Sequence, residues 1–316
     1  MAGALGPQGH FTTAKVDWLG LHPRSAQWVA NWAQTGRTQS GVGKGMLNVY
    51  AGEQVPGWSA PGYPVNTPAR DPWPMMNYWF STYGGDPGTY PDWQQMSTQY
   101  GWDDYSLVAR PAGGAWEVIG VDRGPGGWFA SWFGARRAAG GTIWDKDYTA
   151  HMTGALPAGV CAAKWPLTPL IVRPDEVASG RVDHPLHLAG ALSPHGGDAR
   201  QGVGFQWPAR FHDADYSKVN PSGTLYGAWF RLKADTPLPT ERGAQIIAQA
   251  LKTHGCILGD GSAQNTSGLC VDPRIGQATF DALRSIPITA FEAVDTEPLR
   301  LRPAAGVGDR DYWACR

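Results

Sequence analysis

Residues Leu170–Leu188, LIVRPDEVASGRVDHPLHL, decide the fold that we expect for this chain. An apolar run ends at Val172, and an acidic pair follows Pro174. Ser179-Gly180 predicts a turn, after which apolar and polar residues alternate up to Leu188. The order predicts two strands joined by a tight connection, with carboxylates and imidazoles gathered beside it.

The composition favours a β-rich protein built from short strands. The chain has 316 residues, enough for one large domain or for a domain with an appended region. It contains 42 Gly and 26 Pro without any repeat period, and its 16 Trp are several times the usual share. Such a chain is typical of strands joined by many turns, with aromatic rings packed inside or offered to sugars.

Charge and hydropathy exclude several classes of protein. The 26 basic and 27 acidic residues nearly balance, which is not the footprint of a nucleic-acid-binding protein. No run of about 18 apolar residues occurs, so we expect no membrane span. Residues 1–10 lack the basic start and apolar core of a secretory signal, so the sequence predicts none.

Two domains are predicted from the distribution of proline. Residues 1–95 are rich in Pro, Gly and aromatic residues, which predicts an ordered but irregular docking arm. One short helix is expected in it, beginning at Ser25 with Trp28 and Trp32 on one face. Residues 96–316 are expected to form the second domain, which should stay folded when the arm is removed.

The second domain is predicted to be mainly β. A Gly113-Gly114 turn between two alternating runs predicts a hairpin. Only one helix is expected here, running from near Thr240 to a cap at Gly255. Strands at short intervals with a single helix indicate a β-sandwich or jelly-roll-like domain with one covering helix.

The four cysteines lack the spacing of a zinc or haem site. Cys256 and Cys270 flank a Gly-Asp-Gly turn and are expected to face each other across a hairpin. A disulfide and a pair of buried free thiols are both compatible with this pattern.

The central stretch contains the candidate catalytic residues Glu176, Asp183 and His184. A carboxylate and an imidazole on opposite sides of a short turn are the groups used in acid–base catalysis. His187 is three residues after His184, so on a strand the two rings face opposite sides and do not share one ion. The competing structural interpretation, which we favour, makes His184 a buried hydrogen-bonded residue and Glu176 a turn carboxylate.

A second candidate site lies in the run His212-Asp213-Ala-Asp215. Alternating carboxylates on a loop are how proteins surround a hard cation, so the hypothesis is a Ca²⁺ site. The run lacks the Gly and the further acidic positions of a calcium-binding loop, and a solvated turn is the competing interpretation.

Four tryptophans on predicted strands are candidates for ligand binding: Trp128, Trp132, Trp207 and Trp229. A sugar stacks its C–H face on a flat indole, so aromatic side chains on strands suit a glycan-binding face. Because Trp is on average highly buried, a role in the core is the competing interpretation.

Several phrases, taken in order, carry a resemblance to a known group: Trp116-Glu117, Ile171 through His184, Trp207-Pro208-Ala209, Phe230-Arg231-Leu232 and Phe291–Asp295. Over about residues 100–296 they resemble a largely uncharacterised group of mostly secreted β-rich proteins of actinobacteria and other bacteria. This chain departs from the group's pattern with His184-Pro185-Leu186 in place of His-Ala-Leu and His254-Gly255 in place of Tyr-Gly. The resemblance implies an extracellular, glycan-facing role.

Two functions are therefore expected as alternatives. The first is a surface-facing recognition or structural module, a minor protein of a phage tail tip directed at an actinobacterial cell envelope. It would lie on the virion surface, need no signal peptide, contact other tail proteins or further copies of itself through residues 1–95, and bind an envelope glycan. The second is a secreted or virion-borne glycan hydrolase or lyase that uses Glu176 with Asp183 or His184.

Overall fold

The structure is a computed structural model of the chain. It describes residues 11–35, 44–51, 163, 170–190, 204–209, 222–261 and 267–300, together with the strand backbone at 53–59, 74–77, 104–112, 115–124 and 127–128.

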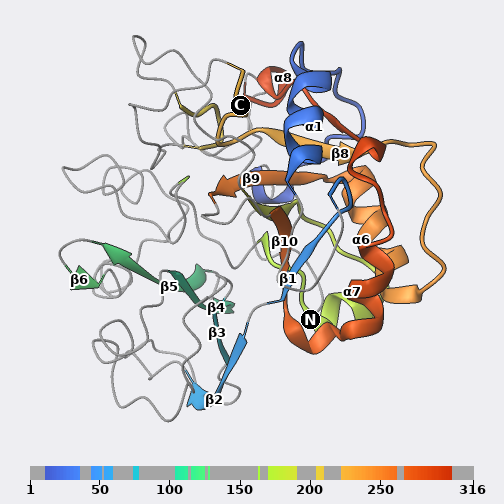
Figure 1. Cartoon of the computed structure of the whole chain (residues 1–316). Coiled ribbons are helices and arrows are strands. Elements are labelled where there is room, and N and C mark those ends of the chain that lie inside the picture. Colours follow the sequence, from blue (N-terminus) through green and yellow to red (C-terminus); the bar gives the residue numbers. More distant parts are fainter. Residues whose placement is uncertain are drawn as a thin grey trace.

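A six-stranded mixed sheet forms the centre of the described body (Figure 1). Its strands, in spatial order, are β1 (Val49–Ala51), β10 (Ser267–Val271), β7 (Leu186–Gly190), β9 (Cys256–Asp260), β8 (Trp229–Leu232) and β11 (Phe291–Ala293). β1 runs parallel to β10 and β7 runs parallel to β9, whereas the other neighbours are antiparallel. The sheet confirms β-structure at the centre of this body, but the α-helices of the described residues contain more residues than its six strands, so the prediction of a mainly β domain is not confirmed.

Helices surround this sheet. They are α1 (Ser25–Gln34), α5 (Pro174–Ser179), α6 (Arg242–Thr253), α7 (Gln277–Leu283) and α8 (Glu297–Arg300), with short 3-10 turns at Phe11–Thr13, Pro273–Ile275 and Ile288–Ala290. Trp229 and Phe230 are successive residues of β8, so their side chains leave opposite faces of the sheet. The Phe230 ring lies 5.0 Å from that of Trp32 on α1, whereas Trp229 donates to the carbonyl of His254, which follows α6. The prediction of one covering helix is wrong.

Helix α6 confirms the helix predicted after Thr240. Its buried face repeats at helical spacing through Ala244, Ile247 and Leu251. The Glu241 side chain caps the first turn by accepting from the backbone N–H of Ala244 at 2.7 Å. At the other end Gly255 adopts a positive φ of 71°, the conformation that stops a helix and that glycine tolerates best.

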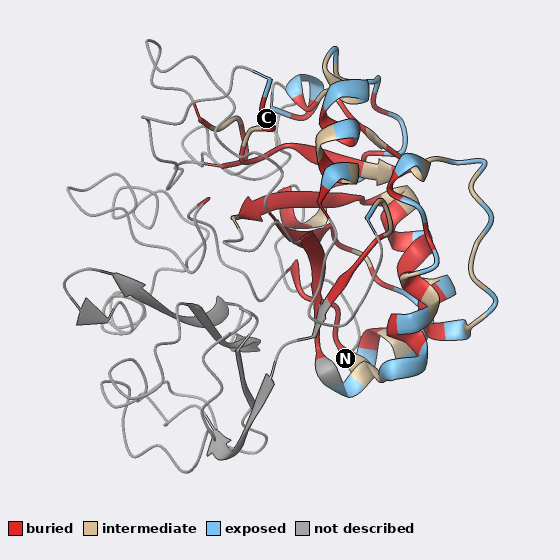
Figure 2. Ribbon diagram, viewed as in Figure 1, coloured by how far each residue is buried: buried red, intermediate tan, exposed pale blue. Residues whose placement is uncertain are grey.

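The N-terminal residues belong to the core of the same body. Trp28 and Trp32 of α1 have no exposed surface and pack in one cluster with Phe11, Val16 and the residues of the sheet. Figure 2 shows the sheet and the inner side of the helices buried, with exposed residues on their outer sides. This corrects the predicted boundary: residues 11–35 and 44–51 are not an arm that docks on a separate domain, because the sheet would lose an edge strand and much of its core without them.

A second sheet is formed by the stretch of chain between β1 and β7. It orders β2 (Glu53–Ser59), β3 (Pro74–Asn77), β4 (Asp104–Ala112), β5 (Ala115–Gly124) and β6 (Gly127–Trp128) consecutively, and every pair is antiparallel. The hairpin predicted around Gly113-Gly114 is present as β4 and β5. Packing of two sheets as a sandwich or jelly roll remains a prediction.

The central stretch differs from its prediction. Val172 forms only an isolated bridge to Val271, and the residues from Pro174 to Ser179 form helix α5 where a connection between strands was expected. Pro174 is the first residue of this helix, a position where its fixed φ fits and its missing N–H costs nothing. Strand structure begins only at Leu186, so His184 precedes β7 while His187 lies inside it.

Candidate functional site

The polar centre of the body is a cluster around Glu176, which α5 places in the interior. The Glu176 side chain has no exposed surface. Its Oε2 accepts from the backbone N–H of Arg173 at 3.0 Å, which caps the first turn of α5, and its Oε1 lies 2.7 Å from Nη2 of Arg173. Arg173 is itself almost completely buried. The carboxylate is therefore paired within its own helix turn.

His184 completes this cluster. Its ring is fully buried, with Nε2 3.2 Å from Glu176 Oε2 and Nδ1 2.8 Å from the carbonyl oxygen of Pro185. Both ring nitrogens of His184 therefore lie within hydrogen-bond distance of oxygen atoms of the protein itself, and the buried ring is closed to a substrate. The structure thus brings together Glu176 and His184, as predicted, in an arrangement that joins α5 to the start of β7.

Asp183 is not part of this cluster. Its side chain is 29% exposed, and its Oδ2 lies 2.5 Å from Nε of Arg181, which is largely exposed. A glycosidase needs two carboxylates facing each other across a scissile bond, roughly 5 to 10 Å apart and both open to the substrate. Glu176 is buried, and Asp183 pairs with Arg181 at the surface. The two carboxylates Glu176 and Asp183 are therefore not both open to a substrate, as glycoside hydrolysis requires.

Two further histidines, His187 and His254, are buried in this body. Burial lowers the pKa of His187 to about 3, so its ring is neutral in the folded protein. Burial, with a smaller contribution from nearby His184, also lowers the pKa of His254. His254 Nδ1 lies 2.7 Å from the carbonyl oxygen of Ala14, which ties the end of α6 to the N-terminal segment.

Two of the predicted ligand-binding tryptophans are core residues. Trp229 has no exposed surface, and Trp207 is also buried, with its ring centroid 6.4 Å from that of Trp229. Neither ring offers a face to a sugar, which corrects the prediction for both residues. Trp128 lies on β6, whose side chains are outside the described part, and Trp132 lies outside the described residues.

The metal site is not tested by the structure. His212, Asp213 and Asp215 lie outside the described residues. Within the described ranges, no group of three His, Cys, Asp or Glu side chains could hold a metal ion. Ca²⁺ binding at residues 212–215 remains a prediction.

The two central cysteines do not form a disulfide with each other. Cys256 lies on β9 and Cys270 on β10, and both are buried. Strand β7 lies between β9 and β10, so the predicted hairpin between them does not form and no disulfide joins them. Burial raises the pKa of Cys256, which keeps its thiol protonated and unreactive.

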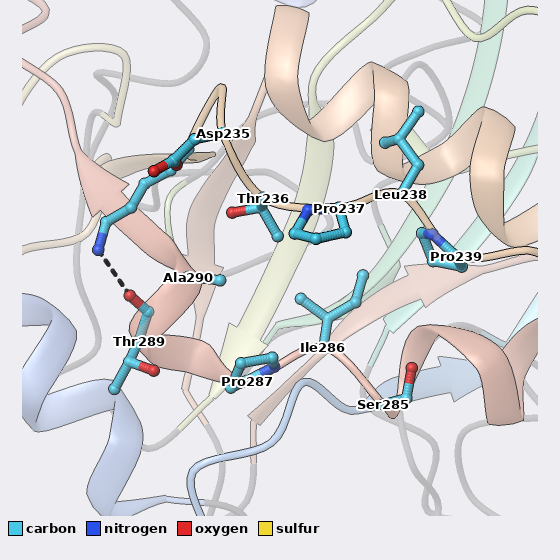
Figure 3. Close-up of a pocket in the computed structure, with 11 residues that line it drawn as sticks. Asp235, Thr236, Pro237, Leu238, Pro239, Ser285, Ile286, Pro287, Thr289 and Ala290 are labelled. Carbon is cyan, nitrogen blue, oxygen red and sulfur yellow. Dashed lines mark hydrogen bonds between the residues drawn. The ribbon is translucent and has the colours of Figure 1, made fainter.

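A surface hollow of about 560 Å³ lies between the loop after β8 and the segment before β11 (Figure 3). Leu238, Ile286 and several prolines give it apolar walls, and Asp235 is the sole carboxylate among its lining residues. Lys233 also lines the hollow, and its Nζ donates to the carbonyl of Thr289 at 2.8 Å. The hollow contains neither an aromatic platform nor a pair of acid–base groups.

Sequence reasoning missed three residues that organise this part of the molecule: Arg173, Arg231 and His254. The guanidinium of Arg231 bonds Glu292 and the carbonyls of Val16 and Leu19. The signal for Arg173 was its place directly before Pro-Asp-Glu, the start of a helix. No local signal marks Arg231, whose partners lie more than 200 positions away or on another strand.

Comparisons of the chain with models of protein families, with curated proteins and with solved structures find no match. None of the helices in the described part of the chain is both long and apolar enough to cross a membrane.

Proposed function

We propose that the protein is a non-catalytic recognition and structural module directed at a glycan of a bacterial cell envelope, carried as a minor protein at the tail tip of a phage of actinobacteria. The observation that carries the non-catalytic part is the bonding of the Glu176–His184 pair. Both residues are buried, and both ring nitrogens of His184 face acceptors of the protein itself. A buried pair bonded in this way stabilises the fold and leaves no group to attack a substrate.

The envelope-directed part of the proposal is supported by the sequence. The phrases between Trp116 and Asp295 resemble mostly secreted bacterial proteins, and the chain has 16 Trp residues, an abundance that suits contact with sugars. Virion proteins reach the cell exterior by lysis, so a protein of this class meets the envelope without being secreted.

Binding to envelopes tests recognition. The full-length protein is mixed with purified actinobacterial envelopes and sedimented, and we expect it in the pellet and released by soluble envelope polysaccharide. Immunogold labelling of purified virions should place the protein at the tail tip. A protein that stays in the supernatant, or virions without label, would contradict the respective part of the proposal.

The alternative function is a glycan hydrolase or lyase that uses Glu176 with Asp183 or His184. Its test is release of reducing ends from envelope glycans by the wild-type protein. Activity that disappears in a folded Glu176→Gln variant would establish the enzyme and overturn the non-catalytic proposal, whereas we expect no release above background.

A further inference from the structure

Trp18 stands out among the tryptophans with described side chains because its indole is 52% exposed, whereas Trp28, Trp32, Trp207 and Trp229 are buried. It occupies a tight turn of the N-terminal segment, between the buried residues Val16 and Leu19. Leu21, 57% exposed, is the other large apolar side chain exposed in the described part of the chain. The turn therefore inserts two side chains into the core and directs an aromatic ring outward.

The turn is held rigidly. Arg231 Nη1 donates to the carbonyls of Val16 at 2.6 Å and Leu19 at 2.9 Å, and the N–H of Val16 donates to the carbonyl of Thr253. The indole N–H of Trp18 donates to the carbonyl of Lys15 at 3.0 Å, which fixes the orientation of the ring. A ring that is already oriented loses little conformational entropy when a ligand stacks on it.

The size and polarity of this surface favour a sugar over a protein partner. Trp18 and Leu21 together expose on the order of 200 Å² of apolar surface, whereas a stable protein interface buries roughly 800 Å² on each partner. One indole matches the C–H face of one pyranose ring. Lys15 and Asp17, both exposed, flank the indole in sequence and provide a donor and an acceptor for hydroxyl groups.

We propose that Trp18 is a stacking platform for a pyranose ring of a neutral polysaccharide, with Lys15 and Asp17 bonding its hydroxyls. This inference rests on the proposed function, and it replaces buried Trp207 and Trp229 with an exposed residue as the contact to the glycan.

The test is electrophoresis of the full-length protein in native gels that contain dextran, mannan or galactan. At least one of these polysaccharides should retard the wild-type protein. Trp18→Ala should weaken the binding about tenfold, the loss expected for one aromatic contact, and Trp18→Phe should retain part of it. Leu21→Ala is the matched control and should bind almost as the wild type does. All variants should keep the wild-type melting temperature, since both side chains are half exposed.

Three results would overturn this assignment. The first is a wild-type protein that none of the three polysaccharides retards, and the second is Trp18→Ala retarded as strongly as the wild type. The third is a wild-type dimer on gel filtration that Trp18→Ala converts to a monomer, which would make the turn a protein contact. Sedimentation with envelopes separates the two proposals. If the wild type and Trp18→Ala bind envelopes equally, the proposed recognition of the envelope stands, and the assignment of Trp18 as the stacking platform is wrong.

Discussion

At the scale of residues, the polar groups of this protein act on stability through burial. Glu176, Arg173 and His184 form one buried cluster, and His187 and His254 are buried as well. A buried charge is tolerated only when it is paired, and burial disfavours the charged form of an imidazole. Burial of His187 and His254, which lowers the pKa of both residues, therefore makes the fold sensitive to pH.

His187 provides the clearest dependence on pH. The unfolded chain takes up a proton on this residue near pH 6.5, whereas in the folded protein burial lowers its pKa to about 3. Between these values the unfolded state binds more protons, so stability is complete above pH 6.5 and is lost as the pH falls, by up to about 1.4 kcal/mol per pH unit. His254 acts in the same direction, since burial lowers its pKa as well.

We expect urea titrations to show a contribution from His187 of about 2 kcal/mol lost between pH 7 and pH 5. His187→Gln removes the titrating group, so the variant should show a correspondingly smaller change over this range. If the free energy of unfolding falls equally between pH 7 and pH 5 in the wild type and the variant, His187 does not take up a proton on unfolding.

At the scale of elements, Arg231 joins the N-terminal segment to the sheet. Its bonds to Val16, Leu19 and Glu292 span the segment, β8 and β11. Arg231→Lys keeps the positive charge but lacks the planar guanidinium that donates to several acceptors at once. It should lower the free energy of unfolding by about 2 kcal/mol. Limited digestion with trypsin should cut faster after Lys15 in this variant.

The control for this prediction is Arg181→Lys, because Arg181 forms only a surface pair with Asp183. Such exposed pairs contribute between about 0 and 1 kcal/mol. Equal free energies of unfolding for Arg231→Lys and Arg181→Lys would show that the hydrogen bonds of Arg231 contribute nothing to stability.

The elements that the sequence predicted best are those whose signal is local. Helix α6 has a regular apolar face and a terminal Gly255, and α1 buries the predicted Trp28 and Trp32. Helix α5 was missed because the residues around Pro174 were assigned to a tight connection between two strands, although proline followed by Asp and Glu also starts helices. In the candidate site, local spacing brought Glu176 near His184, but it could not show that the pair faces inward, because burial depends on distant segments.

At the scale of the whole molecule, one core is made from both ends of the described chain. The ring of Trp32 on α1 packs at a tilt against those of Phe230 and Phe291, and its indole N–H donates to Ser267 on β10. Prolines and glycines suggested an arm, but membership of a core is decided by contacts far apart in sequence. A chain without residues 1–95 should therefore be unfolded or insoluble.

A matched pair of variants tests this without truncation. Trp32→Ala should lower the free energy of unfolding by about 3 to 5 kcal/mol, because it opens a cavity and removes a buried hydrogen bond. Trp18→Ala, at an exposed indole, should change it by less than about 0.5 kcal/mol. If both substitutions change the free energy of unfolding by similarly small amounts, the N-terminal residues are not part of the core, and the prediction of a separate arm would be correct.

The most direct test of the structural role of the buried cluster is the free energy of unfolding of Glu176→Gln, measured with urea at pH 7. Glutamine keeps the shape of the side chain but removes the charge that pairs with Arg173 and His184. Breaking a buried pair by removing one partner costs about 3 to 5 kcal/mol, and the retained shape and amide oxygen place the expected loss near the lower value, about 3 kcal/mol. A variant as stable as the wild type, within about 0.5 kcal/mol, would contradict the structural role and return Glu176 to the candidates for catalysis.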